Sequence, residues 1–307
     1  MDNTSSDNNN SKDNKRSEFT KNDLLLLTKA RLSLLVIVTA VVGFIVASKS
    51  SENSTDWWLL FHTVLGCAFA AAASSVFNQL MEIDIDAKMS RTSDRPLPAK
   101  KIKPAIAFAM GWVFAAIGLV HLAVKVNPLA CAFAAATLFV YMFVYTPMKR
   151  RSGMNTLVGA VSGALPPLIG WAGAGGGFNS LAPYFIFALL FLWQLPHFVA
   201  INWMYREEYE SAGFVMWSNG DINGDRTANL AILFTAAIIG LMLMTTFADF
   251  ISIWAASGLV LVSIVKLRYS IRFKLNPSRE KARSLFLYTL LYLPVSLAII
   301  ILGWKVQ

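Results

Sequence analysis

Long apolar segments separated by short polar loops make up most of the chain after residue 23. Each segment approaches the length of about 20 residues that a helix needs to cross about 30 Å of hydrocarbon. Helices of soluble proteins rarely stay apolar on every side, so the pattern predicts an all-α integral membrane protein with about nine transmembrane helices. The predicted helices cover residues 24–47, 57–77, 104–124, 128–146, 154–172, 181–204, 228–247, 250–267 and 284–304.

The first 23 residues have the opposite character, because they are polar, low in complexity and almost free of apolar side chains. Such a segment cannot bury enough surface to offset the entropy of ordering. We therefore predict a disordered tail over 1–23 and a single membrane domain over 24–307. The tail lacks the apolar core of a secretory signal and is too acidic for a mitochondrial transit peptide, which favours a retained tail and a bacterial protein.

Lysine and arginine positions predict the orientation of the helices, because these residues concentrate on the cytoplasmic side of a membrane protein. The chain has 27 of them. If the N-terminus is cytoplasmic, 24 lie on the inner side, and the three outside are Lys49, Lys125 and Lys305. This distribution predicts a cytoplasmic N-terminus and an outer C-terminus. It also explains the net charge of +9 without a nucleic-acid partner.

Composition excludes two further classes of protein. Only 15% of the residues are charged and 56% are hydrophobic, whereas soluble domains are about 25% charged. The two cysteines, Cys67 and Cys131, both lie in apolar segments. They cannot form a disulfide framework, and no cysteine–histidine cluster indicates a zinc site.

Acidic residues gather in two loops that the predicted topology puts on the same side of the membrane. In the first loop, Asn78, Glu82 and Asp86 are four residues apart, so they share a face if the helix continues past the membrane surface. Carboxylate and amide oxygens suit Mg²⁺, which usually keeps waters and substrate phosphates as further ligands. Asp84 is an additional candidate ligand. The alternative is a solvated loop with incidental charges.

Basic residues follow this acidic stretch directly. Lys88, Arg91 and Arg95 are suited to bind the outer oxygens of a metal-bridged diphosphate. In the second acidic loop, Glu207 and Glu208 follow the sixth predicted helix. These glutamates are candidates for the opposite side of a metal site, and the alternative is a helix end exposed to water.

Polar residues inside predicted helices add candidate cavity-lining positions. Gln194 and His197 flank Pro196, and polar or ionisable groups inside a membrane helix are functional candidates by default. Tyr145, Lys149, Arg150 and Asn155 surround the loop after the fourth helix, where Pro147 is expected to end the helix early. The Pro166–Pro167 pair predicts irregular backbone, which a membrane protein tolerates only where protein or a cavity covers it.

Together these stretches resemble the UbiA superfamily of intramembrane prenyltransferases. The resemblance covers the chain from about residue 24 onward, and within the superfamily the PPLIGW and WQLPH stretches are similar to the branch that farnesylates heme. The stretches that carry it are 78–98, 145–171, 193–216 and the opening of the first helix, TKARLSLLVIVTAVVGF.

The resemblance implies nine helices bundled around a central cavity, in a magnesium-dependent enzyme of the bacterial inner membrane with its active-site loops in the cytoplasm. It implies farnesyl diphosphate as donor and heme B as a substrate rather than a cofactor, with water addition giving heme O for heme–copper terminal oxidases. A heme A synthase or terminal oxidase assembly is the implied protein partner. The expected metal ligands are Glu82, Asp84, Asp86, Glu207 and Glu208, and the expected catalytic residues are Asn78, Glu82 and Asp86. Diphosphate binding is expected from Lys88, Arg91, Arg95, Lys149 and Arg150, and heme binding or cavity lining from Tyr145, Asn155, Gln194 and His197.

Three departures from the family pattern leave the exact ligand set open. Glu82 stands where the family usually has aspartate, and Glu207–Glu208 replaces a pair that normally contains aspartate. Phe214-Val-Met-Trp217 stands in place of Pro-Met-Leu-Pro. One alternative function is a related prenyltransferase that acts on an aromatic acid or a chlorin. Another is a transporter, although transporters tend to carry internal repeats and midplane ionisable residues, whereas the acidic residues here gather at one surface.

Overall fold

A computed structural model describes residues 19–51, 54–248 and 250–306. Within these residues, nine helical segments are long and apolar enough to cross a membrane, which confirms the predicted all-α membrane fold. Single helices form α2 (Ala30–Ser50), α3 (Trp57–Met81), α5 (Pro104–Lys125), α10 (Ala182–Met204), α12 (Asp225–Thr245), α13 (Ile253–Leu275) and α14 (Arg279–Gly303). Two spans are composite. They run through α6 (Pro128–Phe139), η1 (Val140–Tyr145) and α7 (Thr146–Met148), and through α8 (Asn155–Ala164) and α9 (Pro166–Gly173).

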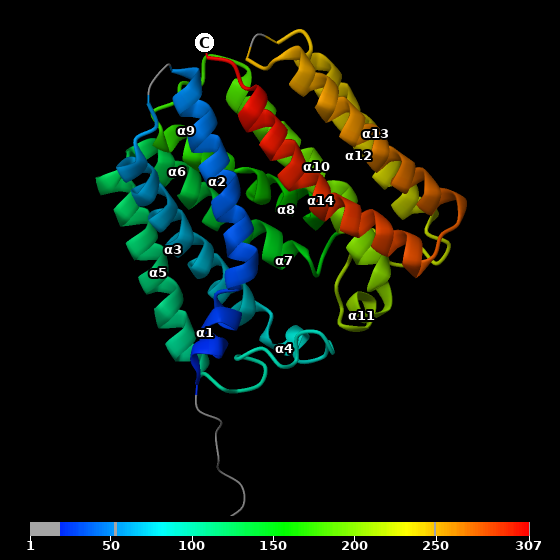
Figure 1. The fold of residues 1–307 in the computed structure, drawn as a ribbon. Coiled ribbons are helices and arrows are strands. Elements are labelled where there is room, and N and C mark those ends of the chain that lie inside the picture. The colour runs from blue at the N-terminus through cyan, green and yellow to red at the C-terminus, as the bar shows by residue number, and fades with distance from the viewer. Residues whose placement is uncertain (1–18, 52–53, 249, 307) are drawn as a thin grey trace, which may run out of the picture.

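The helices pack as two groups side by side (Figure 1). Helices α2, α3, α5, α6 and α9 contact one another, and α10, α12, α13 and α14 form the second group. One apolar cluster lies within the first group, and a second cluster joins α10, α12, α13 and α14 to residues of α2, α8 and α9. The groups also meet where α8 and α9 pack against α10 and where α2 contacts α14. The first described residues and the C-terminal end lie at opposite ends of the bundle (Figure 1), as an odd number of crossings requires.

Helices α2 and α9 pack backbone to backbone through two glycines. A Cβ atom at Gly43 would overlap the carbonyl group of Pro167, and one at Gly170 would overlap the carbonyl group of Ala40. Small residues allow this close approach between membrane helices. Between α8 and α9 the chain bends at Leu165, directly before the two prolines. The irregular backbone predicted there is confirmed, and it is buried within the bundle.

The start of the membrane domain differs from the prediction. Residues 1–18 lie outside the described residues, but α1 (Lys21–Leu27) is a helix that includes residues assigned to the tail. Asp23 and Thr20 form a reciprocal capping box, and Lys101 pairs with the buried Asp23 at 2.9 Å. A break at Lys29, which adopts a left-handed conformation with φ of 47°, separates α1 from α2. The first predicted helix is therefore two helices.

The expectation that Pro147 ends the fourth helix is wrong. The helix widens into the π-helical turn η1 and continues through α7 to Met148. A wider turn accommodates proline, because both the backbone N–H and the hydroxyl of Thr146 donate to the carbonyl of Tyr141. As a result, Lys149 Nζ lies 4.6 Å from the ring centroid of Tyr145, so the two residues share a face.

The eighth membrane helix extends further than predicted, because α13 continues to Leu275. Lys266, which is near the end of the predicted helix, therefore lies well inside α13 and is fully buried. Its Nζ donates to the carbonyl of Trp193 at 3.3 Å and lies 4.7 Å from the ring of Tyr292. Its long aliphatic stem fills core space, while its amino group reaches the backbone carbonyl of Trp193.

Candidate active site

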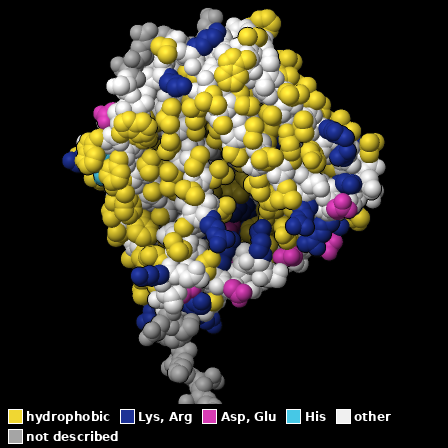
Figure 2. All heavy atoms as spheres, in the orientation of Figure 1, with side chains coloured by type: hydrophobic (Ala, Val, Ile, Leu, Met, Phe, Trp, Pro, Cys, Tyr) yellow, Lys and Arg dark blue, Asp and Glu magenta, His cyan; other side chains and the backbone are white. Residues whose placement is uncertain are grey.

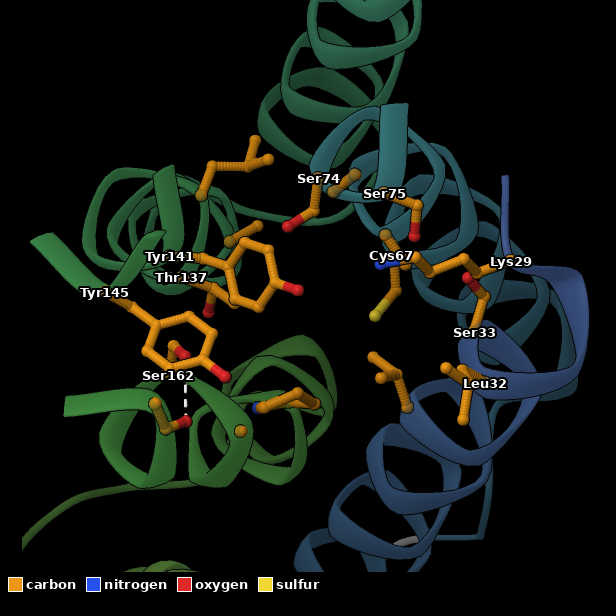
Figure 3. A pocket seen from close by; sticks show the side chains of 18 of the residues that line it. Lys29, Leu32, Ser33, Cys67, Ser74, Ser75, Thr137, Tyr141, Tyr145 and Ser162 are labelled. Carbon is orange, nitrogen blue, oxygen red and sulfur yellow. Dashed lines mark hydrogen bonds between the residues drawn. The ribbon is translucent and has the colours of Figure 1, made fainter. Parts of the chain in front are cut away.

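A polar cavity of about 450 Å³ opens near the end of the bundle that carries α1 and α4 (Ile83–Asp86). Figure 2 shows the bundle hollowed at this position, with lysine and arginine side chains around the opening. An apolar cavity of about 260 Å³ adjoins it (Figure 3). The residues that line both cavities are Lys29, Leu32, Tyr141, Tyr145 and Phe198. The two cavities therefore form a continuous space with one polar end.

Asn78, Glu82 and Asp86 all line the polar cavity. Their helix does not continue unbroken as expected, because α3 ends at Met81 and Glu82 has a non-helical backbone. Asn78 Nδ2 nevertheless donates to Glu82 Oε2 at 2.9 Å, so the predicted pair does meet. The three side chains therefore line one cavity, as predicted, although the continuous helix on which the prediction rested is interrupted at Glu82.

Each of the two buried carboxylates has a basic partner. Lys149 Nζ donates to Glu82 Oε1 at 2.8 Å, and Arg95 donates to Asp86 Oδ2 at 2.6 Å. Burial opposes ionisation of Glu82, but the adjacent Lys149 charge outweighs it and holds the pKa of Glu82 below its usual value. The pKa of Lys149 is raised by Glu82 despite its own burial. Burial dominates at Asp86 and raises its pKa even though Arg95 is adjacent.

Lys29 is a cavity residue for which sequence reasoning proposed only a topological role. Its Nζ donates to Asn78 Oδ1, from the break between α1 and α2. Burial, followed by the positive charges of Arg95 and Lys149, lowers the pKa of Lys29 to about 7. The sequence did contain a signal for this role, namely a lysine at the start of an apolar helix. Ionisable residues are energetically costly in a membrane segment and are usually functional where they occur.

The two acidic loops lie against each other, as their common predicted side requires. Arg91 donates to the hydroxyl of Tyr209 at 3.0 Å and lies 5.2 Å from the ring of Tyr205. Ile85 and Met89 pack with residues of the second loop in a small apolar cluster. These contacts bring α11 (Arg206–Ser211) over the edge of the polar cavity. Tyr209 was also missed, because a tyrosine in an acidic loop gives no distinct signal.

Several predicted site residues do not line either cavity. Asp84, Lys88 and Arg150 are exposed, and Arg150 reaches only the carbonyl of Met81 at 3.4 Å. Glu207 is also exposed and pairs with its neighbour Arg206 at 3.1 Å. Glu208 accepts a hydrogen bond of 3.3 Å from Ser90. The structure thus brings the second acidic loop to the cavity edge through Tyr209 rather than through its glutamates.

The stretch that departs from the family pattern forms part of the cavity wall. Phe214 and Met216 line the polar cavity, and the intervening Val215 is tied down from two sides. Its N–H donates to the carbonyl of Lys149 at 2.8 Å, and its carbonyl accepts from Asn155 Nδ2 at 2.7 Å. Asn155, predicted to line the cavity, does so while also positioning this loop.

Gln194 and His197 lie on different parts of the wall. Gln194 lines the apolar cavity, and its Nε2 donates to the carbonyl of Ala160 at 2.8 Å. His197 lines the polar cavity and is stacked on Phe286 with ring centroids 4.6 Å apart. Its Nδ1 lies 2.8 Å from Thr289 Oγ1.

The hydrogen bonds of Thr289 determine the tautomer of His197. The single hydroxyl proton of Thr289 is donated to the carbonyl of Phe286 at 2.6 Å. Thr289 Oγ1 must therefore accept a proton from His197 Nδ1, because a neutral imidazole has one donor nitrogen and one acceptor nitrogen. The other nitrogen, Nε2, carries the lone pair and has no hydrogen-bond partner among the described residues.

The donors at the polar end fit a magnesium ion that a substrate helps to hold. No group of three or more histidine, cysteine or acidic side chains within the described part of the chain is arranged to hold a metal. Glu82, Asp86 and the amide oxygen of Asn78 instead supply a partial set of hard oxygen donors. Mg²⁺ is commonly bound in this way, by one or two carboxylates together with substrate phosphates.

Comparison with known proteins places the chain in a family. The model of the UbiA prenyltransferase family matches residues 36–291. The chain belongs to this family. Curated relatives of this UbiA-family chain are named protoheme IX farnesyltransferase. The protein of Opitutus terrae is 37% identical, with 92% of this chain and 94% of the relative covered. The protein of Anaeromyxobacter sp. is 39% identical, with 92% and 93% covered.

Solved structures of other proteins share the fold. A structure described as digeranylgeranylglyceryl phosphate synthase superposes with a TM-score of 0.74 at 18% identity, covering 92% of this chain and 97% of that one. A UbiA homolog from Archaeoglobus fulgidus, bound to DMAPP and Mg²⁺, superposes with a TM-score of 0.68 at 19% identity, covering 91% and 99%. At these identities the similarity establishes the architecture alone.

Proposed function

We propose that this protein transfers a farnesyl group from farnesyl diphosphate to a vinyl group of heme B, giving heme O and diphosphate. The C–O bond of the donor breaks, and the terminal vinyl carbon bonds to the farnesyl C1. Water adds to the remaining vinyl carbon and releases a proton. The observation that carries the proposal is one continuous cavity whose polar end has cations and carboxylates and whose other end is apolar. The names of the curated relatives support the choice of donor and acceptor.

The polar end is suited to the diphosphate. Glu82, Asp86 and the Asn78 amide oxygen would hold Mg²⁺, which offsets the negative charge that grows on the departing diphosphate. Arg91, Arg95 and Lys149 line the same cavity and supply fixed positive charge to the diphosphate oxygens, and the Lys29 amine is a further hydrogen-bond donor there. Cations that are already in position stabilise the leaving group without reorganisation as the bond breaks. The A. fulgidus structure with DMAPP and Mg²⁺ supports this assignment.

The apolar cavity is suited to the prenyl tail. Tyr141 and Tyr145 stand at its junction with the polar cavity, where a positive charge develops on the farnesyl C1. Aromatic rings attract a cation placed over their faces, and an apolar enclosure protects it from premature capture by water. These residues would therefore favour transfer to the acceptor over hydrolysis.

His197 is suited to the acceptor. Its side chain lines the polar cavity, and an unprotonated imidazole nitrogen such as Nε2 is a common ligand of iron. Metal-binding histidines usually donate their other ring N–H to a fixed acceptor, as His197 does to Thr289. The other two histidines, His62 and His121, hydrogen-bond to each other at 3.0 Å and line neither cavity. We propose that His197 binds the heme iron and so orients the vinyl group.

Membrane placement follows from the charge distribution. The polar cavity lies at the end of the bundle where lysine and arginine are concentrated, so by the positive-inside rule we assign this end to the cytoplasm. The proposed setting is a bacterial inner membrane with a cytoplasmic N-terminus and an outer C-terminus. Heme O would pass to a heme A synthase or to the assembly of a terminal oxidase.

The test is an assay of the purified protein in lipid with heme B, farnesyl diphosphate and Mg²⁺, with products separated by chromatography. We expect heme O and an equal amount of diphosphate, and loss of both when the metal is chelated. Parallel reactions replace heme B with 4-hydroxybenzoate, a naphthoate or a chlorin. Prenylation of one of these acceptors without formation of heme O would assign the protein to another prenyltransferase activity.

A further inference from the structure

The apolar cavity has a closed end as well as a mouth. Four of the helices around it contribute a last lining residue on the side away from the polar cavity: Val36 from α2, Cys67 from α3, Ala134 from α6 and Ile169 from α9. Three of them, Cys67, Ala134 and Ile169, are buried members of one apolar cluster. This set of residues, which we call the floor, closes the cavity from four helices.

Packing beyond the floor leaves no space for the cavity to continue along α3. A Cβ atom at Gly66 would lie 2.6 Å from the Leu122 side chain. One turn further along α3, Thr63 Oγ1 would lie 2.8 Å from a Cβ atom at Gly173. Helix α3 is therefore in tight contact with α5 and α9 immediately outside the floor. A chain that reaches Cys67 has to stop there.

Small side chains line the parts of the wall that α3 and α8 contribute. Ala70, Ala71, Ser74 and Ser75 line the cavity from α3, and Ser162 and Gly163 line it from α8. Figure 3 shows Cys67 projecting from α3 into the same space that Tyr141 and Tyr145 enter from the opposite side. Because α3 and α8 contribute only small side chains between the mouth and the floor, a prenyl chain can lie along these two helices until it reaches the floor.

The depth of the cavity matches a particular chain length. Cys67 precedes Asn78 by eleven residues of α3, which is about 16 Å at the helical rise of 1.5 Å per residue. A farnesyl main chain of twelve carbons, with bonds near 1.5 Å, extends about 14 Å. One further isoprene unit would add about 5 Å. The axial distance from Asn78 to Cys67 is therefore about 2 Å longer than a farnesyl main chain and about 3 Å shorter than a geranylgeranyl main chain.

We propose that Cys67 is the residue that limits the donor to a farnesyl chain, by closing the far end of the prenyl cavity. The inference rests on the proposed function in so far as the donor is a prenyl diphosphate, and it adds the residue that selects among such donors. A geranyl chain leaves the floor uncontacted. A farnesyl chain reaches it, and a geranylgeranyl chain has to bend or displace it.

The experiment changes the volume of the floor and measures each donor separately. Cys67→Leu raises the floor, and Cys67→Ala lowers it. Cys131→Leu is the matched control, because Cys131 lies on α6, is partly exposed and does not line the cavity. Binding of geranyl, farnesyl and geranylgeranyl diphosphates is measured by calorimetry with Mg²⁺ and no acceptor. The heme B transfer assay is run in parallel.

We expect Cys67→Leu to weaken the binding of farnesyl diphosphate by about tenfold or more, since one misfitted methylene in an apolar pocket has an effect of that size. Geranyl diphosphate should bind as before, which also reports that the variant is folded. Cys67→Ala should strengthen the binding of geranylgeranyl diphosphate relative to that of farnesyl diphosphate. This measurement still tests the proposal if the leucine variant does not fold. Cys131→Leu should leave all three donors unchanged.

An equal loss of geranyl and farnesyl binding in Cys67→Leu, or an unchanged donor preference in both variants, would overturn the assignment of Cys67. The result is separable from the proposed function. If donor preference shifts as expected but heme B is never prenylated, Cys67 limits the donor of an enzyme with another acceptor. If heme O forms and the preference does not shift, the proposed function stands and the role of Cys67 is rejected.

Discussion

Lys149 Nζ contacts Glu82 Oε1 at 2.8 Å, and both side chains are almost completely buried. The pair connects the residue after α7 to the residue after α3, which are 67 positions apart in the sequence. Buried ion pairs contribute little net stability as pairs, but removing one partner leaves a costly unpaired charge. This contact therefore gives a sharp test of how the polar end is held together.

Replacing only one partner of this pair should destabilise the protein strongly. We expect Lys149→Met to lower the free energy of unfolding by about 3–5 kcal/mol, because Glu82 remains charged and buried. The double variant Lys149→Met/Glu82→Gln should recover part of that loss, and both variants should lose activity. Thermal unfolding in detergent measures the stabilities. Additive effects of the two single substitutions would contradict a direct interaction.

Neighbouring aspartates should respond very differently to the same substitution. Asp86→Asn should reduce turnover by about 10²–10³-fold, because it removes a carboxylate at the polar end where the leaving group is stabilised. Asp84→Asn is the matched control, since Asp84 is exposed and outside the cavity. Rates of heme O formation at saturating substrate decide the matter. Equal losses of turnover in the two variants would show that Asp84 also contributes to the active site.

Heme binding should depend on His197 and on its hydrogen-bond acceptor. His197→Ala should abolish the shift of the heme absorption band that accompanies histidine ligation, in the absence of any prenyl donor. Thr289→Val should weaken heme binding less, because the nitrogen ligand remains but its tautomer is no longer held. His62→Ala is the control and should bind heme normally. An unaltered heme spectrum in His197→Ala would exclude iron ligation by this residue.

Stability in acid should depend on Asp23. The hydrogen bond from Lys101, assisted by Thr20, lowers the pKa of Asp23 from 3.8 to about 2. A carboxyl group whose pKa is lowered on folding contributes stability that is present above its unfolded pKa and is lost as the pH falls through the folded pKa. We expect thermal stability to fall between about pH 4 and pH 2, and less steeply in Asp23→Asn. Unfolding scans over this pH range measure both.

The contact between α2 and α9 should not tolerate a methyl group. Gly170→Ala places a Cβ atom against the carbonyl group of Ala40, so we expect a loss of about 1–3 kcal/mol from overpacking. Gly240→Ala, on α12, is the control, because nothing lies within 4 Å of an added Cβ there. Thermal unfolding of the two variants separates steric overlap from the general effect of alanine in a helix. A neutral Gly170→Ala variant would show that the helices can move apart.

Much of the polar site was predictable because its residues are close in sequence. Asn78, Glu82 and Asp86 repeat at helical spacing, and Arg91 and Arg95 follow within ten residues. Local spacing favoured Asp86, which repeats at the interval of Asn78 and Glu82, but it left Asp84 as a further candidate, and the structure places Asp84 outside the cavity. Glu207 and Glu208 were expected to hold the metal because their loop lies on the same side of the membrane as Glu82. The fold instead turns Tyr209 of that loop toward Arg91.

By itself, the sequence determined that the chain crosses a membrane, how often it does so and which end carries the polar chemistry. The cost of leaving apolar helices in water, and of moving charged loops through lipid, acts residue by residue along the chain. Only the tertiary structure decided that Lys29 meets Asn78 and Lys149 meets Glu82, that His197 Nδ1 faces Thr289, and that Cys67 lines the apolar cavity. Those properties depend on packing between helices that are distant in sequence, where the position of a backbone break or a single glycine determines which side chains meet.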